Sequence, residues 1–147
     1  MFLAVSALLS CASAPVVPSG ARSELAPTGK LRAAINYGNP VLAQKDPASG
    51  QPRGVSVDLA HELGRRMGVS VELITFDAAG KVFDALKRGA WDVAFLAIDP
   101  ARATEIVFTA PYVVIEGAYL VPTDSLLRTN QDVDRNGVRV DHPPPIS

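Results

Sequence analysis

One arginine in this chain stands where it could bind an anion. Arg102 comes just after the pair Asp99-Pro100, at the point where the apolar run 93–98 ends. Aspartate before proline favours an extended residue followed by a fixed φ, so Asp99 is expected to cap a helical turn that begins at Pro100. The planar guanidinium of an arginine at such a turn can grip a carboxylate, helped by the free N–H groups of the turn. The pattern predicts a carboxylate-binding residue, and the alternative is a surface ion pair of Arg102 with Asp99 or Glu105.

Groups that could support catalysis are few. A general acid or base near Arg102 would have to be Asp99 or Glu116. The dipeptide His-Glu at 61–62 begins a zinc-protease pattern, but Arg65 stands where that pattern requires its second histidine. The sequence contains no recognisable nucleophile, metal-ligand cluster or phosphate-binding loop, so we predict no catalytic residue, no metal site and no cofactor.

After residue 29 the chain alternates between strand and helix patterns. The expected elements are a strand 31–36, a helix 56–67, a strand 69–76, a helix capped by Asp77 that ends before Gly89, and a strand 93–98 covered on both faces. Ser56 is a candidate cap and Gly68 the expected stop of the first helix, and Trp91 is expected to pack under the sheet edge. This order predicts an α/β fold with an open, mostly parallel βαβαβ sheet and flanking helices. Ligands of such sheets bind at the carboxyl ends of the strands, where Arg102 is expected.

The order of motifs in the second half of the chain supports a family resemblance. Asp92 is followed by Asp99-Pro100-Ala101-Arg102, by Phe108-Thr109-Ala110-Pro111-Tyr112 and by the β-branched segment 113–121. In this order they resemble lobe 1 of the bacterial extracellular solute-binding proteins of the amino-acid-binding type, the ligand receptors of ABC importers. The resemblance covers residues 29–140 and implies a partial periplasmic-binding-protein type II lobe. It also implies that 113–121 is a hinge strand and that 130–133 and 138–140 are the helix and strand that open lobe 2.

The resemblance implies a set of ligand-binding residues. Arg102 matches the arginine that holds the ligand's α-carboxylate, with backbone groups near Ile98 and Asp99 as further partners. Apolar residues that include Ala97 and Ile98 stand where the family places Ser, Thr or Gly, which implies a less polar carboxylate. Glu116 is a candidate partner for a cationic group of the ligand, and a solvated hinge face is the alternative.

The loop after the first strand departs from the family pattern. The family carries an acidic residue there, then an aromatic ring that stacks on the ligand, followed by proline. In this chain Asn36 takes the acidic place and Asn39 the aromatic place. The stacking ring is therefore missing unless Tyr37 substitutes for it.

The amino-terminal residues resemble an export signal. Residues 1–14 are apolar and small, and residues 15–28 are rich in Pro, Ser, Gly and Ala, as in a linker. The sequence Leu-Leu-Ser before Cys11 resembles a lipoprotein box in which Cys11 would carry lipid. Cys11 is the only cysteine, so no intrachain disulfide can form. The apolar run is too short to span a membrane as a helix.

Composition limits the remaining classes of function. The 147 residues are 48% hydrophobic and 20% charged with a formal net charge of −1, which describes a globular chain. Lysine and arginine are dispersed, so we predict no nucleic-acid partner. We assign 29–121 to an incomplete lobe 1 and 122–147 to a hinge and the start of lobe 2. Three prolines at 143–145 end the resemblance, so we predict that the second lobe is missing, that the chain is a truncated fragment, and that one strand edge is left open.

These observations predict a periplasmic or otherwise extracytoplasmic solute-binding component of an ABC importer, without catalysis. Its expected partners are a small carboxylate, such as an amino acid or organic acid, and the membrane subunits of a permease. Contact with the membrane is expected only through a lipid on Cys11. Two alternatives stay open: a dehydratase-like enzyme of the same fold acting on a cyclic carboxylate, and a fragment with no independent activity.

Overall fold

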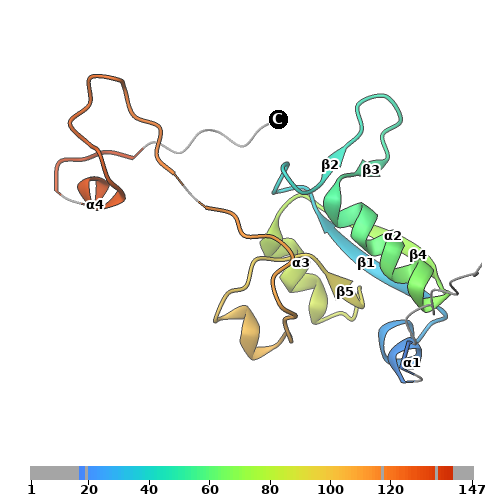
Figure 1. Ribbon diagram of the computed structural model, residues 1–147. Helices are drawn as coiled ribbons and strands as arrows, with labels where there is room; N and C mark the ends of the chain where they lie inside the picture. Colours follow the sequence, from blue (N-terminus) through green and yellow to red (C-terminus); the bar gives the residue numbers. More distant parts are fainter. Residues whose placement is uncertain (1–16, 19, 117, 135, 141–147) are drawn as a thin grey trace, which may run out of the picture. The chain divides into compact units, whose positions relative to one another are not determined.

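The computed structural model describes residues 17, 18, 20–116, 118–134 and 136–140 (Figure 1). The predictions for the export signal, for Cys11 and for the three prolines lie outside these residues. The chain divides into two compact units, Met1–Val107 and Phe108–Ser147. We describe each unit by itself.

The first unit contains an open parallel sheet. Its elements are α1 (Ala21–Leu25), β1 (Lys30–Asn36), β2 (Gln44–Lys45), β3 (Pro52–Arg53), α2 (Val55–Met67), β4 (Ser70–Phe76), α3 (Ala79–Leu86), β5 (Val93–Ala94) and the 3₁₀ turn η1 (Arg102–Thr104). The sheet has the order β4-β1-β5, and β1 is parallel to both neighbours. The predicted α/β fold with a βαβαβ order is confirmed. β2 and β3 form a separate antiparallel pair, which was not among the elements predicted from the sequence.

The central strand β1 is buried on both faces because a helix packs on each. Ala34 lies in a cluster with Val82 and Trp91, which belong to α3 and the segment after it. Its neighbour Ile35 lies in a second cluster with Val57 of α2. Successive side chains of a strand point to opposite faces, so α3 and α2 cover opposite sides of the sheet. The buried faces explain why β1 reads as a nearly continuous apolar run.

Trp91 occupies the packing position that the sequence predicts. Its side chain is buried, and its indole N–H donates to the carbonyl of Val82 at 2.8 Å. The indole thus fills the space beneath α3 while its polar group is satisfied.

Two glycines fix the position of α2 against the sheet. Gly68 adopts the left-handed conformation (φ 65°), and its N–H donates to Arg65, which ends the helix as predicted. A Cβ on Gly64 would lie 2.2 Å from Cγ2 of Val71, so only glycine allows the helix to approach β4 this closely. The expected cap at Ser56 is wrong: the helix begins at Val55 and Ser56 is buried inside the first turn without a capping bond.

A partly buried ion pair joins the start of β5 to β1. The guanidinium of Arg32 donates from Nη2 to Oδ1 of Asp92 at 2.6 Å and from Nε to Oδ2 at 3.1 Å. The backbone N–H of Arg32 also donates to Asp92 Oδ2, and Arg32 Nη1 donates to the carbonyl of Gly89. Burial alone would raise the pKa of Asp92, but the hydrogen bonds and charge of Arg32 outweigh it and keep that pKa below its usual value.

The third strand is shorter than predicted. Only Val93 and Ala94 pair with β1, and the chain then leaves the sheet with Ala97 and Ile98 exposed. The prediction of a strand over 93–98 covered on both faces is therefore wrong beyond Ala94. In the described part of the chain no strand lies on the outer side of β5, and the ladder between β1 and β5 ends at Ala94.

The second unit has little regular structure. It contains α4 (Asn130–Val133), which confirms the short helix predicted at 130–133, and Thr129 with Asp132 forms a capping box at its start. The strands predicted at 113–121 and 138–140 are wrong, because neither segment is paired in the described residues. A β-branched sequence needs a neighbouring strand to form a ladder. Val114 and Leu120 are instead largely exposed.

Within the part of the chain that the structure covers, no helix combines the length and the apolar character needed to cross a membrane.

Candidate functional site

The turn that carries Arg102 is built by Asp99. The carboxylate of Asp99 accepts the backbone N–H groups of Ala101 at 2.9 Å and of Arg102 at 3.2 Å. Its backbone carbonyl accepts the N–H of Ala103 at 2.9 Å. Asp99 thus accepts N–H groups as a capping residue does, but the helical turn begins at Arg102 with Ala101 in the cap position, not at Pro100 as predicted. The same contacts occupy one carboxylate oxygen, Oδ1, with structural bonds.

The guanidinium of Arg102 has no acidic partner in the described part of the chain. It is half-buried and donates from Nη1 to the carbonyl of Ala97 at 3.2 Å. Among the described residues no carboxylate lies within ion-pair distance of it, including Asp99 and Glu105. The alternative of a surface ion pair is therefore not the state of this residue. Arg102 keeps N–H donors available for an anion.

The loop after β1 lies at the same edge of the sheet as Arg102. β1 ends at Asn36 and β4 at Phe76, and the N–H of Tyr37 donates to the carbonyl of Phe76 at 2.8 Å. The segment that leads to Arg102 leaves the carboxyl end of β5, which is the other neighbour of β1. Parallel strands have their carboxyl ends on one edge, so the topology brings these loops to the edge expected for a ligand.

The polar groups of that loop are already engaged in turns. The side-chain oxygen of Asn36 accepts the N–H of Gly38 at 2.9 Å, and that of Asn39 accepts the N–H of Val41 at 3.2 Å. Both amides still have their NH₂ donors for a ligand. They are placed for hydrogen bonding rather than for the ring stacking of the family.

Tyr37 packs into the core on one side. Its ring lies against the cluster that contains Ile35 and Val57, and burial raises the pKa of the phenol. This packing fixes the ring at the end of β1. It also covers part of the ring face, which is then not available to stack on a ligand.

The remaining predicted residues divide between the two units. Ala97 and Ile98 are exposed in the segment before the Asp99 turn. Glu116 is exposed in the second unit. Its role as a ligand partner stays a prediction.

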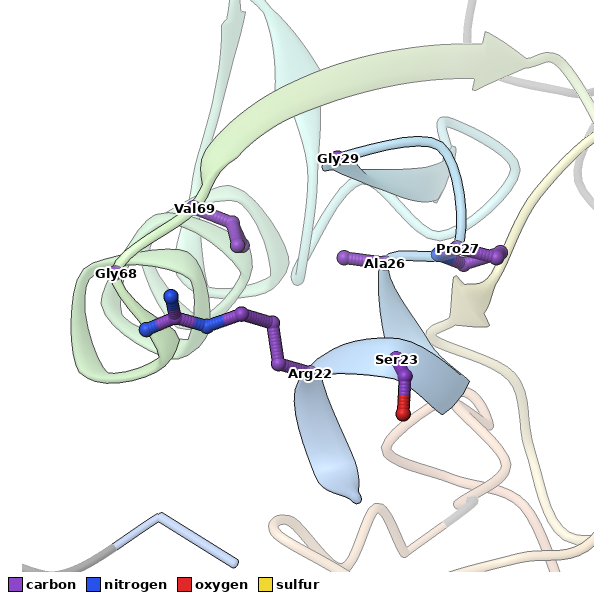
Figure 2. A pocket seen from close by; sticks show the side chains of 7 residues that line it. All are labelled: Arg22, Ser23, Ala26, Pro27, Gly29, Gly68 and Val69. Atoms are coloured by element: carbon purple, nitrogen blue, oxygen red, sulfur yellow. The ribbon is translucent and has the colours of Figure 1, made fainter. Parts of the chain in front are cut away.

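The larger of two described cavities lies elsewhere. It is an open hollow of about 530 Å³ lined by Arg22, Ser23, Ala26, Pro27, Gly29, Gly68 and Val69 (Figure 2). These residues precede β1 and β4, so the hollow is at the amino ends of the strands. A smaller cavity in the second unit is lined by Tyr119, Val121, Leu127, Arg128, Thr129, Asn130 and Val133. Neither includes a predicted site residue, and no pattern in the sequence had singled out Arg22.

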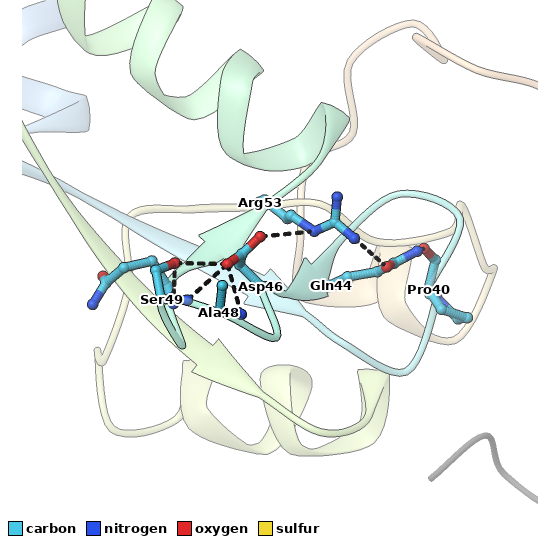
Figure 3. A network of polar contacts seen from close by, with 7 residues as sticks. Pro40, Gln44, Asp46, Ala48, Ser49 and Arg53 are labelled. Carbon is cyan, nitrogen blue, oxygen red and sulfur yellow. Dashed lines mark hydrogen bonds and ion pairs between the residues drawn. The ribbon is translucent and has the colours of Figure 1, made fainter.

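A polar network in the β2–β3 hairpin is explained by its role in stabilising a tight turn. Oδ1 of Asp46 accepts the N–H groups of Ala48 and Ser49 and the hydroxyl of Ser49, while Arg53 approaches Oδ2 at 3.6 Å (Figure 3). The hydrogen bonds from Ser49 chiefly lower the pKa of Asp46. This is the satisfied carboxylate of a tight turn. Among the residues that the structure describes, no group of three acidic, histidine or cysteine side chains could hold a metal ion.

Comparison with solved structures gives relatives of the same architecture. An ancestral amino-acid-binding protein, a precursor of cyclohexadienyl dehydratase, is 30% identical with a TM-score of 0.54, over 62% of this chain and 40% of that one. The arginine-bound form of domain 1 from TmArgBP, the ArgBP of T. maritima, is 26% identical with a TM-score of 0.53, over 60% of this chain and 71% of that one.

A third structure supports the fold alone. An ancestral cyclohexadienyl dehydratase is 23% identical with a TM-score of 0.56, over 67% of this chain and 41% of that one. The chain thus spans less than half the length of the two ancestral proteins, which agrees with a partial, single-lobe match.

The family model for the bacterial extracellular solute-binding proteins, family 3, matches residues 31–138. This range contains the parallel sheet, the Asp99 turn with Arg102 and the segment that follows it. The predicted resemblance is confirmed: the chain belongs to the bacterial extracellular solute-binding proteins, family 3.

Proposed function

We propose that this chain provides the first lobe of an extracytoplasmic receptor for a small carboxylate, an amino acid or an organic acid, and that it works without catalysis. The observation that carries the proposal is the half-buried guanidinium of Arg102, which has no acidic partner among the described residues. A carboxylate would complete its hydrogen bonds in a paired geometry.

The turn before Arg102 is preorganised, and its N–H groups at 101–103 are engaged by Asp99. Oδ1 of Asp99 is engaged with two N–H groups, which holds the turn in one conformation before a ligand arrives. The exposed side chains of Ala97 and Ile98 border the same turn and favour a ligand with an apolar part. Asn36, Tyr37 and Asn39 are the proposed contacts from the β1 loop, and Glu116 the proposed partner of a cationic group.

Single-lobe binding is reasonable for this family. The structure of domain 1 from TmArgBP is the arginine-bound form of one domain. We propose by analogy that the present lobe holds its ligand with a reduced set of contacts. The affinity should be lower than that of a two-lobed receptor, since closure of a second lobe would add contacts and exclude water.

Delivery to the membrane subunits of an ABC permease and an extracytoplasmic location are part of the same proposal. Both rest on the family, whose members are extracellular solute-binding proteins. The proposed lipidation of Cys11 would keep the receptor at the membrane.

A panel of ligands tests the proposal. The purified chain is titrated with arginine, glutamate, an aliphatic monocarboxylate and the amide of the same acid, while the thermal unfolding midpoint and the heat of binding are recorded. At least one carboxylate should bind saturably, its amide at least about tenfold more weakly, and Arg102→Ala should abolish the difference. Arg88→Ala, an exposed arginine elsewhere in the lobe, is the matched control. Equal behaviour of acid and amide would contradict the proposal.

A dehydratase of the same fold is the second candidate, because an ancestral cyclohexadienyl dehydratase shares this architecture. Against it, the carboxylate of Asp99 already accepts two backbone N–H groups through Oδ1 in the turn. Incubation with a cyclohexadienyl carboxylate should therefore leave the substrate unchanged. Turnover that is lost in Asp99→Asn would favour the enzyme.

A further inference from the structure

Exposed basic side chains gather at the end of the lobe opposite to Arg102. Lys30 opens β1 and lies in register with Ser70, the first residue of β4. α2 runs into β4 through Gly68, so Arg65 and Arg66 in its last turn lie at this same end. The common location follows from the topology, because helices of a βαβ unit end where the next parallel strand begins.

Three further cations join this end. The guanidinium of Arg22 lies over Gly68, where a Cβ would be 2.9 Å from its Nη2 (Figure 2). The carbonyl of Gly89 accepts a hydrogen bond from Arg32 at 2.6 Å, which places the preceding Lys87 and Arg88 beside the start of β1. We call this set the basic end: Arg22, Lys30, Arg65, Arg66, Lys87 and Arg88. All six residues are exposed.

The acidic residues at this end do not neutralise it. Glu62 forms ion pairs with both Arg65 and Arg66, so one carboxylate serves two cations. In the described residues none of Arg22, Lys30, Lys87 and Arg88 has an ion-pair partner. Glu24, Glu72, Asp84 and Asp92 are the other acidic residues nearby, and Asp92 is paired with Arg32, which lies outside the set of six. The field of this end is therefore positive.

The opposite end of the sheet has the reverse balance. The acidic residues Asp46, Asp58, Asp77, Asp99 and Glu105 outnumber Lys45, Arg53, Lys81 and Arg102 there. Favourable interaction with helix ends explains Arg65 and Arg66, since cations stabilise helix carboxyl termini. It does not explain Lys30 at the start of a strand or Arg88 beyond the end of α3.

We propose that the basic end is a membrane-facing surface that binds the anionic phosphate headgroups of a lipid bilayer. Juxtamembrane lysine and arginine side chains are attracted to anionic lipids, and a basic patch together with one hydrophobic anchor gives stable attachment. The lipid on Cys11, which is part of the proposed function, would supply that anchor, because Cys11 precedes α1 in the sequence and α1 carries Arg22. The open hollow of about 530 Å³ beside Arg22 gives a headgroup room to approach.

Binding to lipid vesicles tests this surface. The full chain is sedimented with vesicles of phosphatidylcholine alone and with vesicles that also contain phosphatidylglycerol. We expect about tenfold stronger binding to the anionic vesicles, and this preference should fall steeply as salt is added. Because residues 1–14 could bind either vesicle, the ratio between the two compositions is the quantity that reports on charge.

Two triple variants with equal loss of charge locate the effect. Arg22→Gln, Lys30→Gln and Arg88→Gln together should remove the preference for anionic vesicles. Lys45→Gln, Arg53→Gln and Lys81→Gln together should preserve it within about twofold, since they lie at the other end. Circular dichroism establishes that both variants fold. If the first does not fold, Arg88→Gln alone should lower the preference about 1.5-fold, one sixth of the tenfold preference on a logarithmic scale.

Three results would overturn the inference. They are equal binding to both vesicle types, an equal loss in the two triple variants, and stabilisation by inorganic phosphate through Arg22 without any vesicle preference. The last result would identify a site for soluble phosphate instead of a lipid surface. None of them bears on carboxylate binding at Arg102, so the proposed function stands or falls separately.

Discussion

Arg32 and Arg102 lie at opposite ends of one parallel sheet and differ in how far their hydrogen bonds are satisfied. The guanidinium of Arg32 donates to both oxygens of Asp92 and to the carbonyl of Gly89. That of Arg102 donates only to the carbonyl of Ala97, in the described residues. The first arginine holds strands together, and the second has donors left for a ligand. The contrast shows that the role of an arginine in a family motif depends on whether other groups of the protein already bind its N–H donors.

Removal of the carboxylate that binds Arg32 should have the largest effect on stability. Asp92→Ala leaves Arg32 without its partner and frees the start of β5 from β1. The midpoint of thermal unfolding should fall by roughly 10 °C. Asp77→Ala, which breaks the exposed pair with Lys81, should change it by less than about 2 °C. Similar shifts of the unfolding midpoint for the two variants would mean that the Arg32–Asp92 pair stabilises the fold no more than an exposed ion pair does.

Disturbing the close packing of α2 against β4 should cost less stability than loss of the Arg32–Asp92 pair. In Gly64→Ala the new Cβ would lie 2.2 Å from Cγ2 of Val71, so α2 must move away from β4. We expect a net destabilisation of about 1–2 kcal/mol in chemical denaturation. Gly80→Ala is the matched control, because a Cβ there meets nothing within 4 Å, and it should stabilise α3 by about 0.5 kcal/mol. Equal effects of both substitutions would contradict the close approach of α2.

The charge of Asp92 should show itself in the pH dependence of stability. Arg32 holds the pKa of Asp92 below its usual value in the folded chain, so the pair stabilises the fold above the unfolded pKa of about 3.9 and loses this effect as the pH falls through the folded value. Asp92→Asn should therefore be less stable than the native chain at neutral pH. Denaturant titrations should show the two curves converging below about pH 4. A constant gap down to acid pH would indicate that charge is not involved.

Substitution of Arg102 should give the smallest change in stability. Arg102→Ala removes one hydrogen bond to a carbonyl and no ion pair in the described residues, so the unfolding midpoint without ligand should stay within about 2 °C of the native value. Thermal unfolding in ligand-free buffer measures this. A loss as large as that of Asp92→Ala would assign Arg102 a structural role and remove the contrast between the two arginines.

The sheet and its helices were predictable because their pattern is local. The apolar positions of α2 repeat at helical spacing, and Gly68 ends it with a positive φ. The turn at Asp99 was predictable for the same reason, since its contacts span only a few residues. The unpaired state of Arg102 was not, because it depends on where Asp99 and Glu105 direct their carboxylates.

The errors concern features that depend on distant partners. Residues 113–121 have a strand-like sequence, but no neighbouring strand pairs with them in the described residues. The strand predicted over 93–98 stops at Ala94 where its pairing with β1 stops. The hollow beside Arg22 arises only when α1 meets the end of α2, and no spacing in the sequence encodes that encounter.

The most direct test of the central claim is a nuclear magnetic resonance titration of the ¹⁵N-labelled chain with a binding carboxylate. The side-chain Nε–H of Arg102 and the backbone amides of 97–103 should shift together and saturate, while the Nε–H of Arg32 stays in place. Shifts confined to Arg22 and Gly68, or none at Arg102 in the presence of a ligand that binds, would contradict the account.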